Sequence, residues 1–149
     1  MSKKKLINTF LFSIFLFATV NSYSQKDKGF NFPPDFGKTE TRIVIGPIYS
    51  DKVTKSIIEA FEKEYKGRFE RIEDTYGKNV KETPGLRTFL LTVMVMPSRF
   101  TKTNDYKFGL AELKTGKSYE CDFWSGSYKK GARYYAKNLE KFRQANGGK

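Results

Sequence analysis

The sequence predicts a small two-layer domain of the α/β (α+β) class, in which two helices pack on a mixed sheet of about five strands. Apolar residues alternate or run continuously over several short segments, as in strands, and recur at helical spacing over two longer segments. The segments follow in the order strand, helix, strand, strand, hairpin, helix, and glycine or proline separates most of them. The 149 residues suit one such domain.

The first strand and the first helix are expected between residues 41 and 66. From Thr41 to Tyr49, the run Ile43-Val44-Ile45 has no polar alternation, which favours a short central strand buried on both faces. Ser50 or Asp51 then offers an N-cap oxygen, and Gly67 closes the helix. The apolar residues of this helix recur at helical spacing, at Val53, Ile57, Ala60, Phe61 and Tyr65.

Two further strands are separated by a loop. Arg68 to Glu73 is the weakest strand pattern, and Thr75 to Gly85 is a loop marked by glycine, asparagine and proline. Arg87 to Met96 is the strongest, because apolar side chains occupy most positions on both of its faces. We therefore expect this strand in the middle of the sheet, beside the first.

A hairpin is predicted from Tyr106 to Trp124. A two-residue loop at Thr115-Gly116 would pair Leu110 with Cys121 and Phe108 with Phe123. One face would then carry the apolar set Phe108, Leu110, Tyr119, Cys121 and Phe123. The other face would carry Lys107, Gly109, Ala111, Glu120, Asp122 and Trp124.

The second helix is expected to follow a Ser125-Gly126-Ser127 cap and to end before Gly147. Its apolar stripe consists of Tyr128, Ala132, Tyr135, Leu139 and Phe142. Gly131 costs about 1 kcal/mol relative to alanine inside a helix, so a close approach of the helix to the sheet would explain it.

The N-terminal residues have the order of a secretory signal peptide. Three lysines, Lys3 to Lys5, precede an apolar run from Leu6 to Val20 and a small-residue stretch, which predicts cleavage after Ser24. An uncleaved signal anchor is the alternative. We expect residues 25–40 to form an extended aromatic and proline-rich arm, residues 41–146 the single domain, and residues 147–149 a flexible tail.

Composition excludes several classes of chemistry. The chain has no histidine, so the Ser-His-Asp and Cys-His forms of catalysis and His-ligated zinc are excluded. Neither GxGxxG nor GxxxxGK[ST] occurs, so a nucleotide-dependent reaction is not expected. We expect no catalytic residue, no metal site and no cofactor. Cys121, the single cysteine, is expected as a small core residue, and an intermolecular disulfide is the alternative.

Charge gives the first candidate binding site. The net charge is +12 for the whole chain and +9 from Gln25 on. Four cations, Lys130, Arg133, Lys137 and Lys141, lie opposite the apolar stripe of the second helix and are called the basic row below. The row could follow the anionic groups of a polymer, or it could simply keep the helix back solvated.

The second candidate is the side of the sheet that two helices packed together would leave uncovered. Met94, Met96, Val44 and Trp124 would then form an exposed apolar patch, which implies a protein partner, an apolar ligand or a homodimer. Glu120 and Asp122 would point to the same side, where they could hold a cation or act as acid and base, or pair with Lys107 or Arg87.

Together these patterns predict a small secreted or periplasmic protein that is not an enzyme and binds another macromolecule, either a protein or an anionic envelope polymer. Nucleic acid is not expected as a partner, nor is a stable membrane anchor after signal cleavage. One alternative is a carrier of an apolar small molecule, and another is a histidine-free hydrolase or metal-dependent enzyme that uses Glu120 and Asp122. A closed pocket would favour the carrier, a convergent acidic pocket the enzyme, and a flat apolar or basic face the binding protein.

Overall fold

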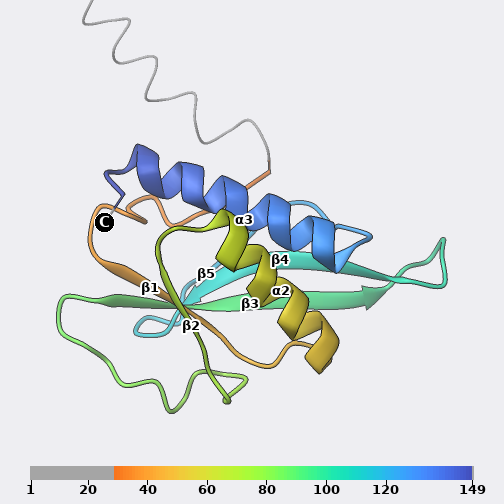
Figure 1. Ribbon diagram of the computed structural model, residues 1–149, viewed down its shortest axis with the longest axis horizontal. Coiled ribbons are helices and arrows are strands. Elements are labelled where there is room, and N and C mark those ends of the chain that lie inside the picture. The colour runs from red at the N-terminus through yellow and green to blue at the C-terminus, as the bar shows by residue number, and fades with distance from the viewer. Residues whose placement is uncertain (1–28, 149) are drawn as a thin grey trace, which may run out of the picture. The chain divides into compact units, whose positions relative to one another are not determined.

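A five-stranded mixed sheet with two helices forms the domain, which confirms the predicted fold class and order of elements (Figure 1). The computed structural model describes residues 29–148, so the predicted signal peptide, the start of the arm and Lys149 lie outside the described residues. The elements are β1 Thr41–Ile45, α2 Asp51–Glu64, β2 Arg68–Arg71, β3 Arg87–Pro97, β4 Asn104–Glu112, β5 Ser118–Glu120 and α3 Tyr128–Ala145. One compact unit, residues 31–149, contains all of them.

The strands lie in the order β2-β1-β3-β4-β5. β1 pairs in parallel with both β2 and β3. The chain returns along the sheet through α2 between β1 and β2, and through residues 72–86 between β2 and β3. β3, β4 and β5 pair antiparallel. β3 lies in the middle beside β1, as predicted, and every residue of β1 is buried.

Both helices begin at serine caps, as their sequences predict. Ser50 Oγ accepts a hydrogen bond from the backbone N–H of Val53, and Ser127 Oγ accepts one from Lys130. α2 ends at Glu64, and the next N–H, that of Tyr65, still closes on the carbonyl of Phe61.

The two helices pack against each other and cover the same face of the sheet. The ring of Phe108 on β4 stacks on Tyr135 of α3, with the centroids 5.7 Å apart, and Phe69 on β2 lies 5.8 Å from Phe61 of α2. Strand register places Phe69, Phe89 and Phe108 on this one face. The main core therefore lies between the helices and this side of the sheet.

Segment 31–40 closes one end of this core. The ring of Phe36 packs 5.4 Å from Phe89, and that of Phe32 packs 5.5 Å from Tyr135. Both side chains are buried. The proline-rich segment is thus fastened to the domain by its aromatic side chains.

The hairpin register differs from the prediction. Leu110 pairs with Tyr119 instead of Cys121, and Cys121 N–H donates to the carbonyl of Phe108, where Phe123 was expected. The turn is longer than two residues, because Glu112 N–H already bonds the carbonyl of Lys117. The predicted register returns only at the Tyr106–Ser125 bridge, so the chain bulges between Cys121 and Ser125.

Candidate functional site

The side of the sheet away from the helices is covered over only part of its extent. The loop of residues 72–86 runs along this side (Figure 1) and bonds to β1 at two points. Ile72 N–H donates to the carbonyl of Ile45, and Nη2 of Arg42 donates to the carbonyl of Lys81. Val44 is fully buried, so its predicted place in an exposed patch is wrong.

The far half of β3 remains uncovered on this side. Met94 and Met96 are 42% and 49% exposed, and Trp124 is 40% exposed. Met94 pairs with Lys107 on β4, whose Nζ lies 5.9 Å from the Trp124 ring centroid. These contacts join Met94 on β3, Lys107 on β4 and Trp124 in the segment after β5. We call the set Met94, Met96, Lys107, Glu120 and Trp124 the open sheet face.

The carboxylates predicted here are arranged differently from a metal or acid–base pair. Glu120 Oε2 lies 3.4 Å from Nζ of Lys107, so this carboxylate is already partnered. Asp122 is exposed and lies beyond β5, which ends at Glu120, because the chain bulges there. Within residues 29–148 no three His, Cys, Asp or Glu side chains gather in a way that could hold a metal ion.

In the middle of this face, Gly109 has no room for a side chain. A Cβ on Gly109 would lie 2.8 Å from the carbonyl oxygen of Tyr119 and 2.9 Å from Oγ1 of Thr92. Only glycine therefore fits between these strands without a shift. Backbone and the small side chain of Thr92 therefore form the surface at Gly109. Met94, Met96 and Trp124 are the large exposed side chains of this face.

The basic row lies on the exposed back of α3, as predicted, but its members are not equivalent. Arg133 donates from Nε and Nη2 to Oε1 of Glu64 on α2, both at 3.3 Å. Lys130, Lys137 and Lys141 are exposed and make no ion pair with any residue that the structure describes. Three free ammonium groups thus remain along this side of α3.

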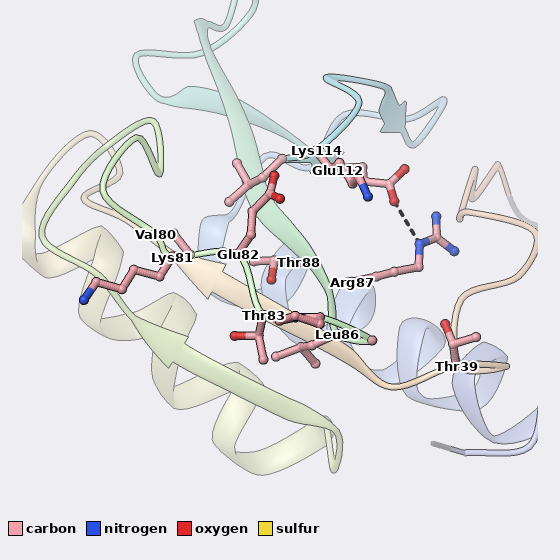
Figure 2. A pocket seen from close by; sticks show the side chains of 13 residues that line it. Thr39, Val80, Lys81, Glu82, Thr83, Leu86, Arg87, Thr88, Glu112 and Lys114 are labelled. Atoms are coloured by element: carbon pink, nitrogen blue, oxygen red, sulfur yellow. Dashed lines mark hydrogen bonds and ion pairs between the residues drawn. The ribbon is translucent and has the colours of Figure 1, made fainter.

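A separate groove of about 670 Å³ lies between loop 80–86, the start of β3 and the end of β4 (Figure 2). Its lining mixes Lys81, Glu82 and Lys114 with the Arg87–Glu112 pair, which Figure 2 shows joined by a dashed line. Apolar side chains, those of Val80, Leu86 and Leu113, line it as well. The groove therefore combines charged and apolar side chains.

The charged groups at this groove satisfy one another. Arg87 donates from Nε to Oε1 of Glu112 at 2.8 Å and from Nη1 to Oδ2 of Asp35 at 2.5 Å. These bonds lower the pKa of both carboxyl groups and raise the pKa of the guanidinium. The cluster therefore ties segment 31–40 to the sheet and offers little free charge for a ligand.

α3 also carries a buried ion pair that was not predicted from the sequence. Arg143 donates from Nε and Nη2 to the two oxygens of Glu140, each at 2.9 Å, and Lys66 N–H donates to Oε2 at 3.1 Å. Burial raises the pKa of Glu140, but these hydrogen bonds outweigh it and the pKa lies below its usual value. The i,i+3 spacing of a Glu and an Arg was the available signal.

Cys121 is buried, and its Sγ lies 3.4 Å from the carbonyl oxygen of Phe123.

Within the described part of the chain, no helix is long and apolar enough to cross a membrane. Comparison with protein-family models, with curated proteins and with solved structures finds no match for this chain.

Proposed function

We propose that this chain is a small secreted or periplasmic binding protein, without enzymatic activity, whose open sheet face docks on another protein. The observation that carries the proposal is the exposure of Met94, Met96 and Trp124 together, around the Lys107 ammonium group. Large apolar side chains that gather on one exposed surface are typical of protein interfaces, and aromatic residues and methionine are enriched there.

The chemistry of the face indicates its partner. Apolar side chains on the partner would cover the methionines and the indole, and a carboxylate would approach the half-buried Lys107, whose ion pair with Glu120 is 3.4 Å long. We therefore expect a partner surface with an acidic side chain among apolar ones. The exposed Lys and Arg side chains elsewhere would speed its approach.

The experiment compares the wild type with one triple and one double variant, each in the chain from Gln25 on. Met94→Ser, Met96→Ser and Trp124→Ser together remove the apolar part of the face, whereas Tyr49→Ser with Tyr76→Ser removes exposed aromatic rings from other surfaces. Binding partners cross-linked in envelope extract are then compared. A partner that the wild type and the tyrosine variant capture and the face variant loses supports the proposal. Equal capture by all three contradicts it.

A second candidate, binding of an anionic polymer, rests on the free ammonium groups of Lys130, Lys137 and Lys141. Reversing these three charges to Glu should lower the salt concentration at which the protein leaves a heparin column more than the same reversal at Lys52, Lys55 and Lys63 on α2. The α2 variant has the same net charge. Equal elution of the two variants would reduce the basic row to a solvated helix back.

A further inference from the structure

The β3–β4 hairpin projects beyond the other elements of the domain (Figure 1). Its tip comprises residues 98–103, between Pro97 at the end of β3 and Asn104 at the start of β4. Ser98 N–H donates to the carbonyl of Thr103 at 2.9 Å, and the hydroxyl oxygens of Thr101 and Thr103 lie 2.6 Å apart. These hydrogen bonds hold the tip in a defined turn.

The tip presents one apolar ring between two cations. Phe100 is 96% exposed, more than any other large hydrophobic side chain that the structure describes. Arg99 and Lys102 beside it are exposed as well. No acidic residue lies within residues 98–103, and the nearest one in the chain, Asp105, is half-buried on β4. The tip is therefore both apolar and cationic at its outermost point.

We propose that this tip inserts Phe100 into the surface of a bilayer that contains anionic lipids, while Arg99 and Lys102 contact the headgroups. A protein interface buries roughly 800 Å² on each partner, which the end of one narrow hairpin does not offer. A bilayer needs only one ring at the depth of the headgroups, with cations at the level of the phosphates. The positive charge of the chain favours an anionic surface.

The contact is reversible, because one apolar side chain with two cations gives weak membrane affinity and both kinds of group are needed. Because the tip joins the end of β3 to the start of β4, the membrane would lie beyond this end of the hairpin. Met94 and Met96 lie further back on β3 than the tip. Phe100→Ser leaves Met94, Met96 and Trp124 unchanged, so vesicle binding and docking at the open sheet face are tested separately.

The test uses the chain from Gln25 on, which contains the whole compact unit of residues 31–149 and lacks the apolar N-terminal run. Sedimentation with vesicles of phosphatidylcholine and phosphatidylglycerol measures binding, and vesicles of phosphatidylcholine alone are the lipid control. Phe100→Ser should weaken binding to the mixed vesicles by about tenfold or more. Tyr76→Ser, which removes a ring that is 69% exposed in loop 72–86, should leave it unchanged.

A second measurement reports the depth of the tip. In a Trp124→Phe background, Phe100→Trp places the single tryptophan of the chain at the tip. Its fluorescence should shift to shorter wavelength with mixed vesicles and stay constant with phosphatidylcholine alone. Circular dichroism checks that each variant is folded, which we expect because Phe100 is almost fully exposed.

Three results would overturn the proposal. One is the absence of wild-type binding to mixed vesicles. Another is that Phe100→Ser binds the mixed vesicles as well as the wild type does, while the double variant Arg99→Gln/Lys102→Gln does not bind. This pair of results would mean that the protein adsorbs by charge alone, without inserting Phe100. The third is an unshifted tryptophan spectrum in sedimented protein. Loss of a cross-linked protein partner by Phe100→Ser, without vesicle binding, would assign the tip to a protein instead.

Discussion

Replacing Glu140 by alanine should destabilise the domain more than any surface substitution, because it leaves a buried cation without its partner. The carboxylate accepts four hydrogen bonds, two from Arg143 at 2.9 Å, one from Lys66 N–H at 3.1 Å and one from Gln144 at 2.8 Å. The Glu140 and Arg143 side chains are only 8% and 10% exposed. Removing one partner of such a pair costs about 3–5 kcal/mol.

The size of this loss makes it easy to measure. For a domain of this length, a loss of about 3–5 kcal/mol lowers the melting temperature by roughly 10–25 °C. Urea unfolding, followed by circular dichroism and by Trp124 fluorescence, gives the free energy of unfolding directly. The loss should shrink in acid. The folded-state pKa of Glu140 is lowered, so the contribution of its carboxylate is present above the unfolded pKa of about 4.3 and disappears as the pH falls through the folded value.

A second substitution, at Arg143, tests whether the unpaired cation is what destabilises the domain: it should raise the free energy of unfolding again. Adding Arg143→Met to Glu140→Leu removes the unpaired cation and keeps the packing of its stem, so the double variant should be more stable than Glu140→Leu alone by about 1–3 kcal/mol. A double variant less stable than the single one would refute the argument. In that case the contacts of Arg143 with the Tyr65 ring and with the carbonyl of Gly148 would matter more than its pairing.

Three further substitutions test other parts of the fold. Cys121→Ala should lower the free energy of unfolding by about 1–2 kcal/mol, because the thiol is buried, and an unchanged melting temperature with loss of a dimer band on a non-reducing gel would instead indicate an intermolecular disulfide. Gly131→Ala should cost about 1–3 kcal/mol in the same assay although alanine favours helices, because its Cβ would lie 2.8 Å from Cε2 of Phe108; an equal or higher stability would contradict the close approach of α3 to the sheet. Arg87→Gln should destabilise at neutral pH, and the difference from the wild type should begin to shrink below the unfolded Glu pKa of about 4.3 and vanish as the pH falls through the lowered folded pKa of Glu112; a pH-independent difference in unfolding free energy would disprove this.

The faces of the strands could be predicted from the sequence, whereas the partners across one hairpin could not. Alternation assigns Phe108 and Leu110 to one face whatever their partners are, because the period of a strand is two residues. The true register of β4 and β5 differs from the predicted one by that period, so Tyr119 replaces Cys121 opposite Leu110 and the paired residues of β5 keep their predicted faces. Leu113 N–H bonds the carbonyl of Thr88 on β3 and is therefore not paired across the hairpin, a long-range contact that the hairpin sequence alone does not reveal.

The charged pairs were harder to predict, because their members meet only in space. Arg133 belongs to the basic row by its helical spacing, yet its bond to Glu64 takes it toward α2 and leaves three lysines free. Arg42 directly precedes the apolar run of β1 and is nevertheless buried, since its guanidinium bonds Thr88, Glu70 and the carbonyl of Lys81. No local pattern distinguishes these cations from solvated ones.

The position of the open sheet face follows from where loop 72–86 attaches. Val44 on β1 and Leu90 on β3 face the same side of the sheet as Met94, yet Val44 is fully buried and Leu90 nearly so. The loop leaves β2 beside Ile45 and enters β3 at Arg87, so it passes over the first half of β3 only. β3 then continues to Pro97 without cover. Loop 72–86 thus buries Val44 and protects one half of the sheet, whereas Met94 and Met96 on the other half stay exposed.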